Sequence, residues 1–308
     1  MAYRVGHVLE YVLLRSLAAF VGLLPHRAAL ALAWALAAVA RGPARRRLRT
    51  AAARVAEVFG GRLEPRVCRA VVRCAWRNFF FNAVEVMRIP RLTPARLLRL
   101  TRWDDPGGLR EYLRAGRGAI LAVPHMGNWD LAGIAAPAHC IPVFFMARRQ
   151  KNPLTDAYLN RLRSQTGVEV VLTDSRSLRE VVRRLARGQV LAILPDVRAK
   201  RAALDIAFLG GRANLGRGLA LFAREAGVPV FPTYCRRTDW TQHVFTSLEP
   251  IWPDPAADPD ADERRITQSV MERVEPAIRA QPEQYFWFNK RWVLEPLGKS
   301  PPDGPPAA

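Results

Sequence analysis

The chain has 308 residues, and its 47 lysines and arginines against 27 acidic residues give a formal net charge of +20. A chain of this length can bury a sizeable core without disulfides, as one large domain with a helical extension or as two small domains. The four cysteines form no C-x-x-C pair and have no nearby histidine at metal spacing, so we expect buried thiols in a reducing compartment, with neither a metal site nor a disulfide framework. The excess positive charge favours a phosphate-bearing or acidic partner, such as nucleic acid, anionic lipid or an acidic protein.

Residues 1–98 are expected to form a helical, membrane-associated region. Residues 5–24 are largely apolar but contain Glu10 and Arg15, and the 13 residues of 28–40 are uncharged. A helix of that second length covers only about 20 Å, less than the ~30 Å hydrocarbon core of a bilayer. We therefore expect the second segment to lie in or against the membrane interface, and the sequence leaves open whether the amino terminus spans the bilayer.

A strongly basic run follows the apolar segments, with six arginines and no acid in residues 41–54. Positive charge after an apolar segment favours the cytoplasmic side of a membrane, and here it predicts contact with lipid headgroups. A solvated helix face is the alternative interpretation. Apolar residues at three- and four-residue spacings extend the helical pattern through 64–98, with an aromatic stripe expected to pack on the next domain.

Residues 99–296 are expected to form one α/β domain, followed by a disordered tail at 297–308. Strand-like runs lie at 119–124, 142–147, 168–172, 190–194 and 228–234, and amphipathic helical segments lie at 153–167, 177–188, 216–226 and 262–280. Alternation of this kind predicts a mostly parallel sheet flanked by helices.

Polar residues follow three of the predicted strands at or near their ends: His125, Arg148 and Asp196. The carboxyl ends of parallel strands meet at one edge of a sheet, and ligands bind there in open α/β folds. We therefore expect these three side chains to converge on one site.

His125 and Asp130 are the candidate chemical pair at this edge. Asn128 is a plausible N-cap, which places Asp130 in the first turn of a helix, where its carboxylate can orient the His125 ring. The free ring nitrogen would then act as a general base. A purely structural histidine beside a helix-capping acid is the alternative interpretation.

The sequence offers this base no enzyme nucleophile to activate. It contains no G-x-S-x-G elbow, and no cysteine is placed to use His125. The pattern therefore favours direct attack of a substrate hydroxyl on an activated acyl group such as a thioester. Backbone amides around Gly127 and Asn128 are the candidate oxyanion donors.

Five stretches occur in a distinctive order: HMGNWD (125–130), ARRQKNPL (147–154), LPDVRAK (194–200), AFLGG (207–211) and VPVFPTY (228–234). Together they resemble the late acyltransferases of lipid A biosynthesis, a family that adds lauroyl or myristoyl chains and includes phosphatidylinositol mannoside acyltransferases. The resemblance extends to QYFWFNKRW (284–292). LPDVRAK stands where glycerolipid acyltransferases usually have F-P-E-G-T-R-S, which favours the glycolipid branch.

The resemblance implies roles for individual residues. His125 and Asp130 match the catalytic dyad of the family. Arg148 and Asn152 match the second motif, in which an arginine contacts the donor or the acceptor phosphate. Asp196 matches the aspartate of the third motif.

Three glycines match the loop and the helix start that follow in the family: Gly210, Gly211 and Gly218. The chain also departs from the family pattern. Arg198 stands where a second acid is common, and other residues replace the usual serine and threonines: Asn214, Leu215 and Arg217. These departures bear on the identity of the acceptor.

The leading hypothesis is a membrane-bound acyltransferase that moves a fatty acyl chain from acyl carrier protein or coenzyme A to a hydroxyl of a membrane glycolipid, such as a lipid A precursor. It would need no cofactor besides the thioester, and it would act at the cytoplasmic face of the inner membrane. The alternatives are a phosphatidylinositol mannoside or other glycerolipid acyltransferase, and a non-catalytic protein that binds membranes or nucleic acid. No zinc-finger, RNP or helix-turn-helix motif supports nucleic-acid binding. The oligomeric state is left open.

Overall fold

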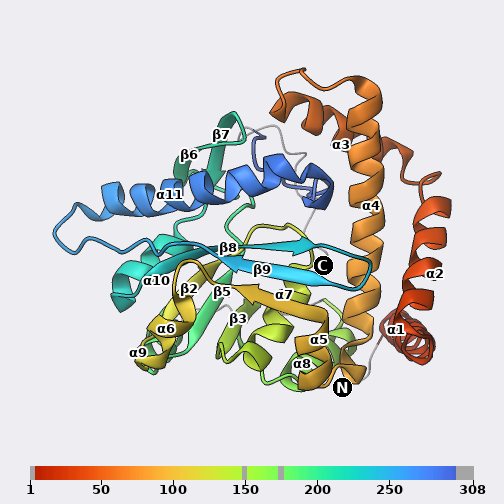
Figure 1. The fold of residues 1–308 in the computed structure, drawn as a ribbon, viewed down its shortest axis with the longest axis horizontal. Coiled ribbons are helices and arrows are strands. Elements are labelled where there is room, and N and C mark those ends of the chain that lie inside the picture. The colour runs from red at the N-terminus through yellow and green to blue at the C-terminus, as the bar shows by residue number, and fades with distance from the viewer. Residues whose placement is uncertain (1–3, 148–150, 173–176, 296–308) are drawn as a thin grey trace.

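The computed structural model describes residues 4–147, 151–172 and 177–295. Within these residues a seven-stranded sheet runs in the order β1-β9-β8-β2-β5-β3-β4, with helices on both faces (Figure 1). Neighbouring strands are parallel except for the pair β8 and β9. The expected α/β fold with a mostly parallel sheet is therefore confirmed.

The strands are short and the helices alternate with them along the chain. The sheet contains β1 (Thr101–Asp104), β2 (Ala119–Ala122), β3 (Val143–Ala147), β4 (Glu169–Leu172), β5 (Val190–Ile193), β8 (Val230–Arg237) and β9 (His243–Ser247). The helices are α1 (Val5–Leu23), α2 (His26–Val39), α3 (Arg45–Val58), α4 (Pro65–Met87), α5 (Pro94–Leu100), α6 (Leu109–Arg114), α7 (Trp129–Ala135), α8 (Pro153–Ser164), α9 (Ser177–Ala186), α10 (Gly218–Ala226) and α11 (Pro259–Ala280).

Two hydrophobic cores lie on opposite faces of the sheet, because successive side chains of a strand point to opposite faces. In β2, Ile120 and Ala122 belong to one core, whereas Ala119 and Leu121 belong to the other. Helices α3, α4, α9, α10 and α11 cover the first core, and α5 to α8 cover the second. Because α3 and α4 contribute to the first core, that core continues across the expected boundary at residue 98.

Helices α1 and α2 pack along α4 and form the right-hand edge of the molecule in Figure 1. Their outward side chains are apolar and exposed, with Leu13 of α1 at 70% and Val39 of α2 at 78%. Among the described residues, α1 is the one helix with the length and composition to cross a membrane. Its other face contacts α8, where Tyr11 packs edge-on against Tyr158.

The structure corrects the helical pattern expected through 64–98. Helix α4 ends at Met87, and a short 3-10 turn at Ile89–Arg91 leads to α5. Pro90 and Pro94 explain the break, because a proline has no amide hydrogen for a helical hydrogen bond.

Two parts of the fold were not expected from the sequence. Strands β1 and β9 extend the sheet, and β6 (Leu204–Phe208) forms a separate hairpin with β7 (Gly211–Leu215). The hairpin turns at Leu209 and Gly210, whose φ angles are 52° and 80°. Two positive φ angles are typical of the tight turns that join paired strands. Strand β6 alternates buried and half-exposed or exposed side chains, so it lacks the continuous apolar run of the central strands.

Candidate active site

His125 and Asp196 meet because they follow neighbouring parallel strands in matching register. Ala122 at the end of β2 lies opposite Ile193 at the end of β5. Each of the two polar residues comes three positions later, so both chains bring them to the same level beyond the sheet edge. The expected convergence at this edge is thus observed for these two residues, while Arg148 lies outside the described part of the chain.

The Asp196 carboxylate holds His125 at two atoms. One oxygen, Oδ2, accepts the backbone amide of His125 at 2.9 Å, and the other, Oδ1, lies 2.8 Å from the ring nitrogen Nδ1. A carboxylate can only accept, so Nδ1 carries the proton and donates it. This tautomer leaves Nε2 as the ring nitrogen that can take a proton from a substrate. The Tyr285 hydroxyl donates a further hydrogen bond to Asp196.

Burial and charge act in opposite directions on the pKa of His125. Burial alone would lower it, but the charge and hydrogen bond of Asp196, with a smaller contribution from the charge of Asp130, raise the pKa above its usual value. For Asp196, burial favours the neutral acid, yet the His125 ring, the amide and Tyr285 lower the pKa of its carboxyl. The site therefore holds an ionised carboxylate against a histidine that is more basic than usual.

Asp130 lies in the first turn of α7, as the sequence predicts, and the Asn128 side chain caps that helix by accepting the Leu131 amide at 3.0 Å. The hydrogen bond to the histidine ring, which the sequence analysis assigned to Asp130, is made by Asp196. Asp130 acts on His125 through its charge. The reason is the register of β2 and β5, which no local spacing within 125–130 could reveal.

Aromatic rings enclose the histidine. Trp129 meets the His125 ring edge-on at 5.0 Å between centroids, and Phe286 lies 6.2 Å from it. The His125 side chain retains 16% exposure, whereas that of Asp196 retains 1%. The histidine ring is therefore partly accessible, while the carboxylate beside it is shielded from water.

The carboxyl-terminal segment runs beside the histidine loop and fixes its backbone. The Phe286 amide donates to the His125 carbonyl at 2.8 Å, and the Gly127 amide donates to the Gln284 carbonyl at 2.9 Å. Gly127 has a φ of 61°, and an added Cβ would lie 2.4 Å from the Cys235 carbonyl oxygen. The Gly127 amide, expected as an oxyanion donor, is thus committed to a structural hydrogen bond, and glycine is required there for its conformation.

A buried polar network behind the loop was missed by sequence reasoning. Glu85 of α4 receives two hydrogen bonds from Arg237 at the end of β8, at 2.8 and 2.7 Å, and one from the Asn128 side chain at 2.7 Å. His243 lies 3.1 Å from the same carboxylate. These charges lower the pKa of Glu85 well below its usual value despite complete burial.

Asn82, one turn before Glu85 on α4, extends this network to the loop itself. Its side chain donates to the Gly127 carbonyl at 2.6 Å and accepts from Arg237 at 3.0 Å. The sequence contains one indication of this network: Asn82 and Glu85 are polar residues in an otherwise apolar helical stripe. Their partners lie more than 40 residues away along the chain, so only the fold shows the network.

The other predicted site residues have local structural contacts. Asn152 is buried, caps α8 by accepting the Leu154 amide at 3.1 Å, and donates to the His7 carbonyl of α1 at 3.0 Å. Gly210 lies in the β6–β7 turn, Gly211 begins β7, and Gly218 begins α10. An added Cβ would lie 3.5 Å from Arg279 at Gly210 and 3.2 Å from Leu294 at Gly211, and the binding role expected for the three glycines stays a prediction.

Two apolar pockets share Trp129 and Asp130 as lining residues. One, of about 440 Å³, lies between α7 and the ends of β2, β3 and β5 and includes Leu121, Phe145 and Ala192. The other, of about 240 Å³, lies among α1, α4, α7 and α8. Within the described residues, no group of three or more His, Cys, Asp or Glu is placed to hold a metal ion.

The cysteine expectation needs one correction. All four cysteines are free thiols, but Cys140 is exposed rather than buried, and Cys74 is half-buried. Cys140 follows a short 3-10 helix and has a φ of 63°, so it ends that turn at the surface.

Comparison with known proteins places the chain in a family. A model described as bacterial lipid A biosynthesis acyltransferase matches residues 5–293. The chain belongs to this family. It is therefore an acyltransferase, and the resemblance drawn from the sequence motifs is confirmed.

Named relatives come from two branches of this family. The phosphatidylinositol mannoside acyltransferase of Mycolicibacterium smegmatis is 27% identical over 216 residues, which cover 68% of each chain. The lipid A biosynthesis lauroyltransferase of Escherichia coli is 26% identical over 212 residues, covering 65% of each chain. The lipid A biosynthesis palmitoleoyltransferase of Escherichia coli is 24% identical over 208 residues, covering 66% of this chain and 65% of that protein. The aligned part thus spans about two thirds of these relatives.

Proposed function

We propose that this acyltransferase moves a fatty acyl chain from an acyl thioester to a hydroxyl group of a membrane glycolipid. The hydrogen bond between His125 Nδ1 and Asp196 carries the proposal, because it leaves Nε2 free to accept the hydroxyl proton. The alkoxide character that develops then attacks the thioester carbonyl, and a thiol leaves. No enzyme nucleophile is needed, since the thioester is already activated.

Asp196 is the proposed orienting residue, and Asp130 is proposed to stabilise the imidazolium through its charge. Both raise the pKa of His125, which favours the protonated ring formed during attack. A general base of this kind contributes roughly 10²–10⁴ in rate. Backbone amides at the start of α7 remain the proposed oxyanion donors. The Asn128 amide replaces that of Gly127, which already donates to the Gln284 carbonyl.

The apolar pocket between α7 and the sheet is proposed to hold the acyl chain. It shares Trp129 and Asp130 with the site, and its other lining side chains are mainly apolar. Burial of methylene groups there would contribute about 0.8 kcal/mol each. A chain held in this pocket would end with its thioester near the His125 ring, which packs against Trp129.

Two acceptor classes are supported by the relatives, namely lipid A precursors and phosphatidylinositol mannosides. The donor is proposed to be acyl carrier protein or coenzyme A, and the location is the cytoplasmic face of the inner membrane. The exposed apolar side chains of α1 and α2 support membrane association. The contacts of α1 with α4 and α8 favour a helix that lies at the interface.

Lipid analysis of cells with and without the gene tests the acceptor. We expect one glycolipid class to lose the mass of a single acyl chain, and that class identifies both the acceptor and the chain. Purified protein with His125→Ala should transfer acyl groups at least about 10²-fold more slowly than wild type. Wild-type transfer rates by this variant would contradict the mechanism.

A further inference from the structure

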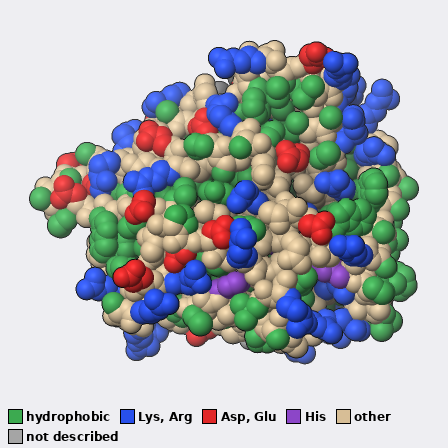
Figure 2. All heavy atoms as spheres, viewed as in Figure 1, with side chains coloured by type: hydrophobic (Ala, Val, Ile, Leu, Met, Phe, Trp, Pro, Cys, Tyr) green, Lys and Arg blue, Asp and Glu red, His purple; other side chains and the backbone are tan. Residues whose placement is uncertain are grey.

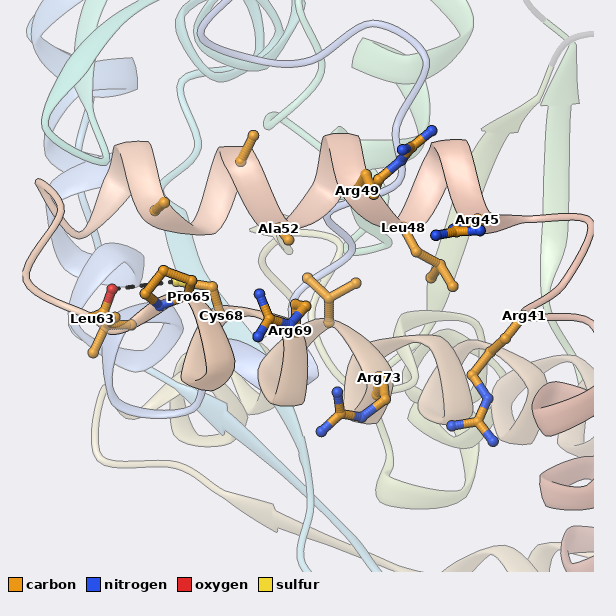
Figure 3. A pocket seen from close by; sticks show the side chains of 13 residues that line it. Arg41, Arg45, Leu48, Arg49, Ala52, Leu63, Pro65, Cys68, Arg69 and Arg73 are labelled. Atoms are coloured by element: carbon orange, nitrogen blue, oxygen red, sulfur yellow. Dashed lines mark hydrogen bonds between the residues drawn. The ribbon is translucent and has the colours of Figure 1, made fainter.

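A second hollow lies away from the histidine, between α3 and the first half of α4 (Figure 3). Its volume is about 630 Å³, and Arg73 is the last residue of α4 that lines it. Asn82, which reaches the active-site loop, comes nine residues later on the same helix. At 1.5 Å per helical residue this separates the two features by roughly 13 Å. The hollow, called here the α3–α4 groove, is therefore distinct from the catalytic site.

Five arginines line the α3–α4 groove: Arg41, Arg45, Arg49, Arg69 and Arg73. Among the residues that the structure describes, none of the five forms an ion pair with an acidic side chain, whereas arginines such as Arg217 and Arg224 do. Several unneutralised cations around one concave surface create a positive potential that attracts phosphate groups. Arginine is also suited to hold phosphate oxygens in pairs.

The floor of the groove is apolar. Leu48 and Ala52 of α3 face α4 (Figure 3). Val72 of α4 also lines the groove. Because alanine side chains are small, those on α3 leave space between the two helices. A free phosphate or the acidic surface of a protein would gain nothing from such a floor, whereas a hydrocarbon chain would be removed from water by it.

The groove is continuous with the apolar edge of the molecule. Arg41 comes two residues after Val39, the exposed last residue of α2, and Trp34 of the same helix is also exposed. Figure 2 shows hydrophobic side chains along the right edge, with Lys and Arg side chains gathered above them. If the apolar edge meets a bilayer, the arginines lie at the depth of the headgroups.

We propose that the α3–α4 groove binds an anionic phospholipid of the membrane. The phosphate lies at the end formed by Arg41 and Arg45, with Arg73 opposite them, and one acyl chain extends over Leu48 and Ala52. Basic rims and apolar floors together distinguish such a site from a purely electrostatic patch. The proposal does not depend on the acyl-transfer reaction, because it concerns binding by residues outside the catalytic site.

Vesicle flotation with purified full-length protein tests whether the arginines of the groove bind the lipid phosphate. Vesicles of phosphatidylcholine alone are compared with vesicles containing one fifth phosphatidylglycerol at fixed salt. We expect Arg45→Ala/Arg73→Ala to weaken binding to the anionic vesicles about tenfold. The matched control is Arg46→Ala/Arg62→Ala, which removes the same charge from exposed positions that do not line the groove. Equal losses in the two double variants would overturn the site.

A neutral substitution tests whether the apolar floor of the groove binds an acyl chain. Ala52→Trp fills the floor without a change in charge, and we expect it to weaken binding to anionic vesicles severalfold. Thr50→Trp, on the exposed side of α3, is its control and should bind as wild type. If Ala52→Trp keeps its thermal unfolding temperature and binds as wild type, the chain does not lie in the groove and the proposal fails.

Wild type and the Arg45→Ala/Arg73→Ala variant also distinguish a phospholipid from two other ligands, inorganic phosphate and acyl carrier protein. Inorganic phosphate at millimolar concentration should not displace the protein from anionic vesicles, because it has no chain to occupy the floor. Acyl carrier protein should bind wild type and Arg45→Ala/Arg73→Ala equally. Loss of carrier binding in this variant with unchanged vesicle binding would overturn the lipid assignment in favour of a protein partner.

Discussion

At the scale of single residues, the site consists of a histidine whose protonation is set by two carboxylates at different places. Asp196 shares a hydrogen bond with the ring, and Asp130 contributes only through its charge to the raised pKa of His125. The proposed base works in its neutral form, so we expect activity to be lost as the pH falls through the His125 pKa. Because that pKa is raised, the loss occurs at a higher pH than the usual value near 6.5 would give.

Exchange of each acid for its amide should separate the two roles. We expect Asp196→Asn to lower kcat by about 10²–10⁴ and to move the acidic limb of the pH–rate profile to lower pH, because the negative charge is lost and the one amide oxygen cannot accept from both the His125 backbone amide and Nδ1. Asp130→Asn should move the limb in the same direction by less. Steady-state rates between pH 5 and 9 give both quantities. A larger shift in Asp130→Asn than in Asp196→Asn would return the orienting role to Asp130.

At the scale of elements, α4 holds the histidine loop in place from behind. Glu85 and Asn82 project from one side of this helix to the end of β8 and to the loop that precedes α7. All of these groups are buried, so each hydrogen bond that is lost leaves a charge or dipole without water to replace it. The helix that the sequence suggested as a packing surface is therefore also a polar support for the site.

Removal of the central charge should destabilise the protein. We expect Glu85→Ala to lower the free energy of unfolding by about 3–5 kcal/mol, because Arg237 remains buried without its partner. Since the pKa of Glu85 is depressed, its contribution is full above about pH 4.3 and is lost as the pH falls through the folded-state pKa. Urea denaturation of wild type and Glu85→Ala at neutral and acidic pH measures the difference in the free energy of unfolding. Glu64→Ala, which breaks an exposed pair with Arg66, should cost under about 1 kcal/mol.

Helix α1 offers a test of membrane contact at the same scale. Leu13 is 70% exposed on its outward face, so Leu13→Glu should leave folding unchanged and weaken vesicle binding. We expect a loss of at least about tenfold, because a charge replaces an apolar group in the membrane interface. Ala256→Glu adds the same charge in the exposed loop before α11 and should bind as wild type. Unchanged binding of Leu13→Glu would place the membrane surface elsewhere.

At the scale of the whole molecule, the last described segment joins regions that are far apart in the sequence. Tyr285, Trp287 and Trp292 are buried in the same core as α3 and α4, and Arg54 of α3 donates to the Trp287 carbonyl at 2.7 Å. The same segment supplies the hydrogen bonds on either side of His125. The amino-terminal helices, the sheet and the carboxyl terminus therefore depend on one another for stability.

Two truncations test this dependence. Removal of residues 284–308 should abolish cooperative unfolding, because the lost burial of several aromatic side chains approaches the whole stability of a domain, about 5–15 kcal/mol. Removal of 297–308 alone should leave the thermal midpoint unchanged if that tail is disordered, as its composition predicts. Circular dichroism and calorimetry report both results. A folded 1–283 fragment would show that the segment is dispensable.

The sequence alone was sufficient for the central strands and the helices between them. The apolar run at 119–124 is buried on both faces, so its composition predicts a strand without reference to partners, and the run at 190–194 was recognised in the same way. The order of the motifs was sufficient for the family, and the strand-end rule placed His125 and Asp196 at one edge. Edge strand β1 escaped notice because its pairing partner β9 is distant in the chain. Strand β6 escaped notice because buried and exposed side chains alternate in it, without a continuous apolar run.

Tertiary structure decided which acid orients the histidine and what supports its loop. Asp130 is near His125 in the sequence, but the parallel pairing of β2 with β5 brings Asp196 to the ring instead. The Glu85 network likewise joins residues that are distant along the chain, and the α3–α4 groove forms only because α3 packs against α4. Local spacing determines which segments form helices and strands, whereas a hydrogen bond of 2.8 Å depends on the register between them, and that register is fixed only when the cores pack.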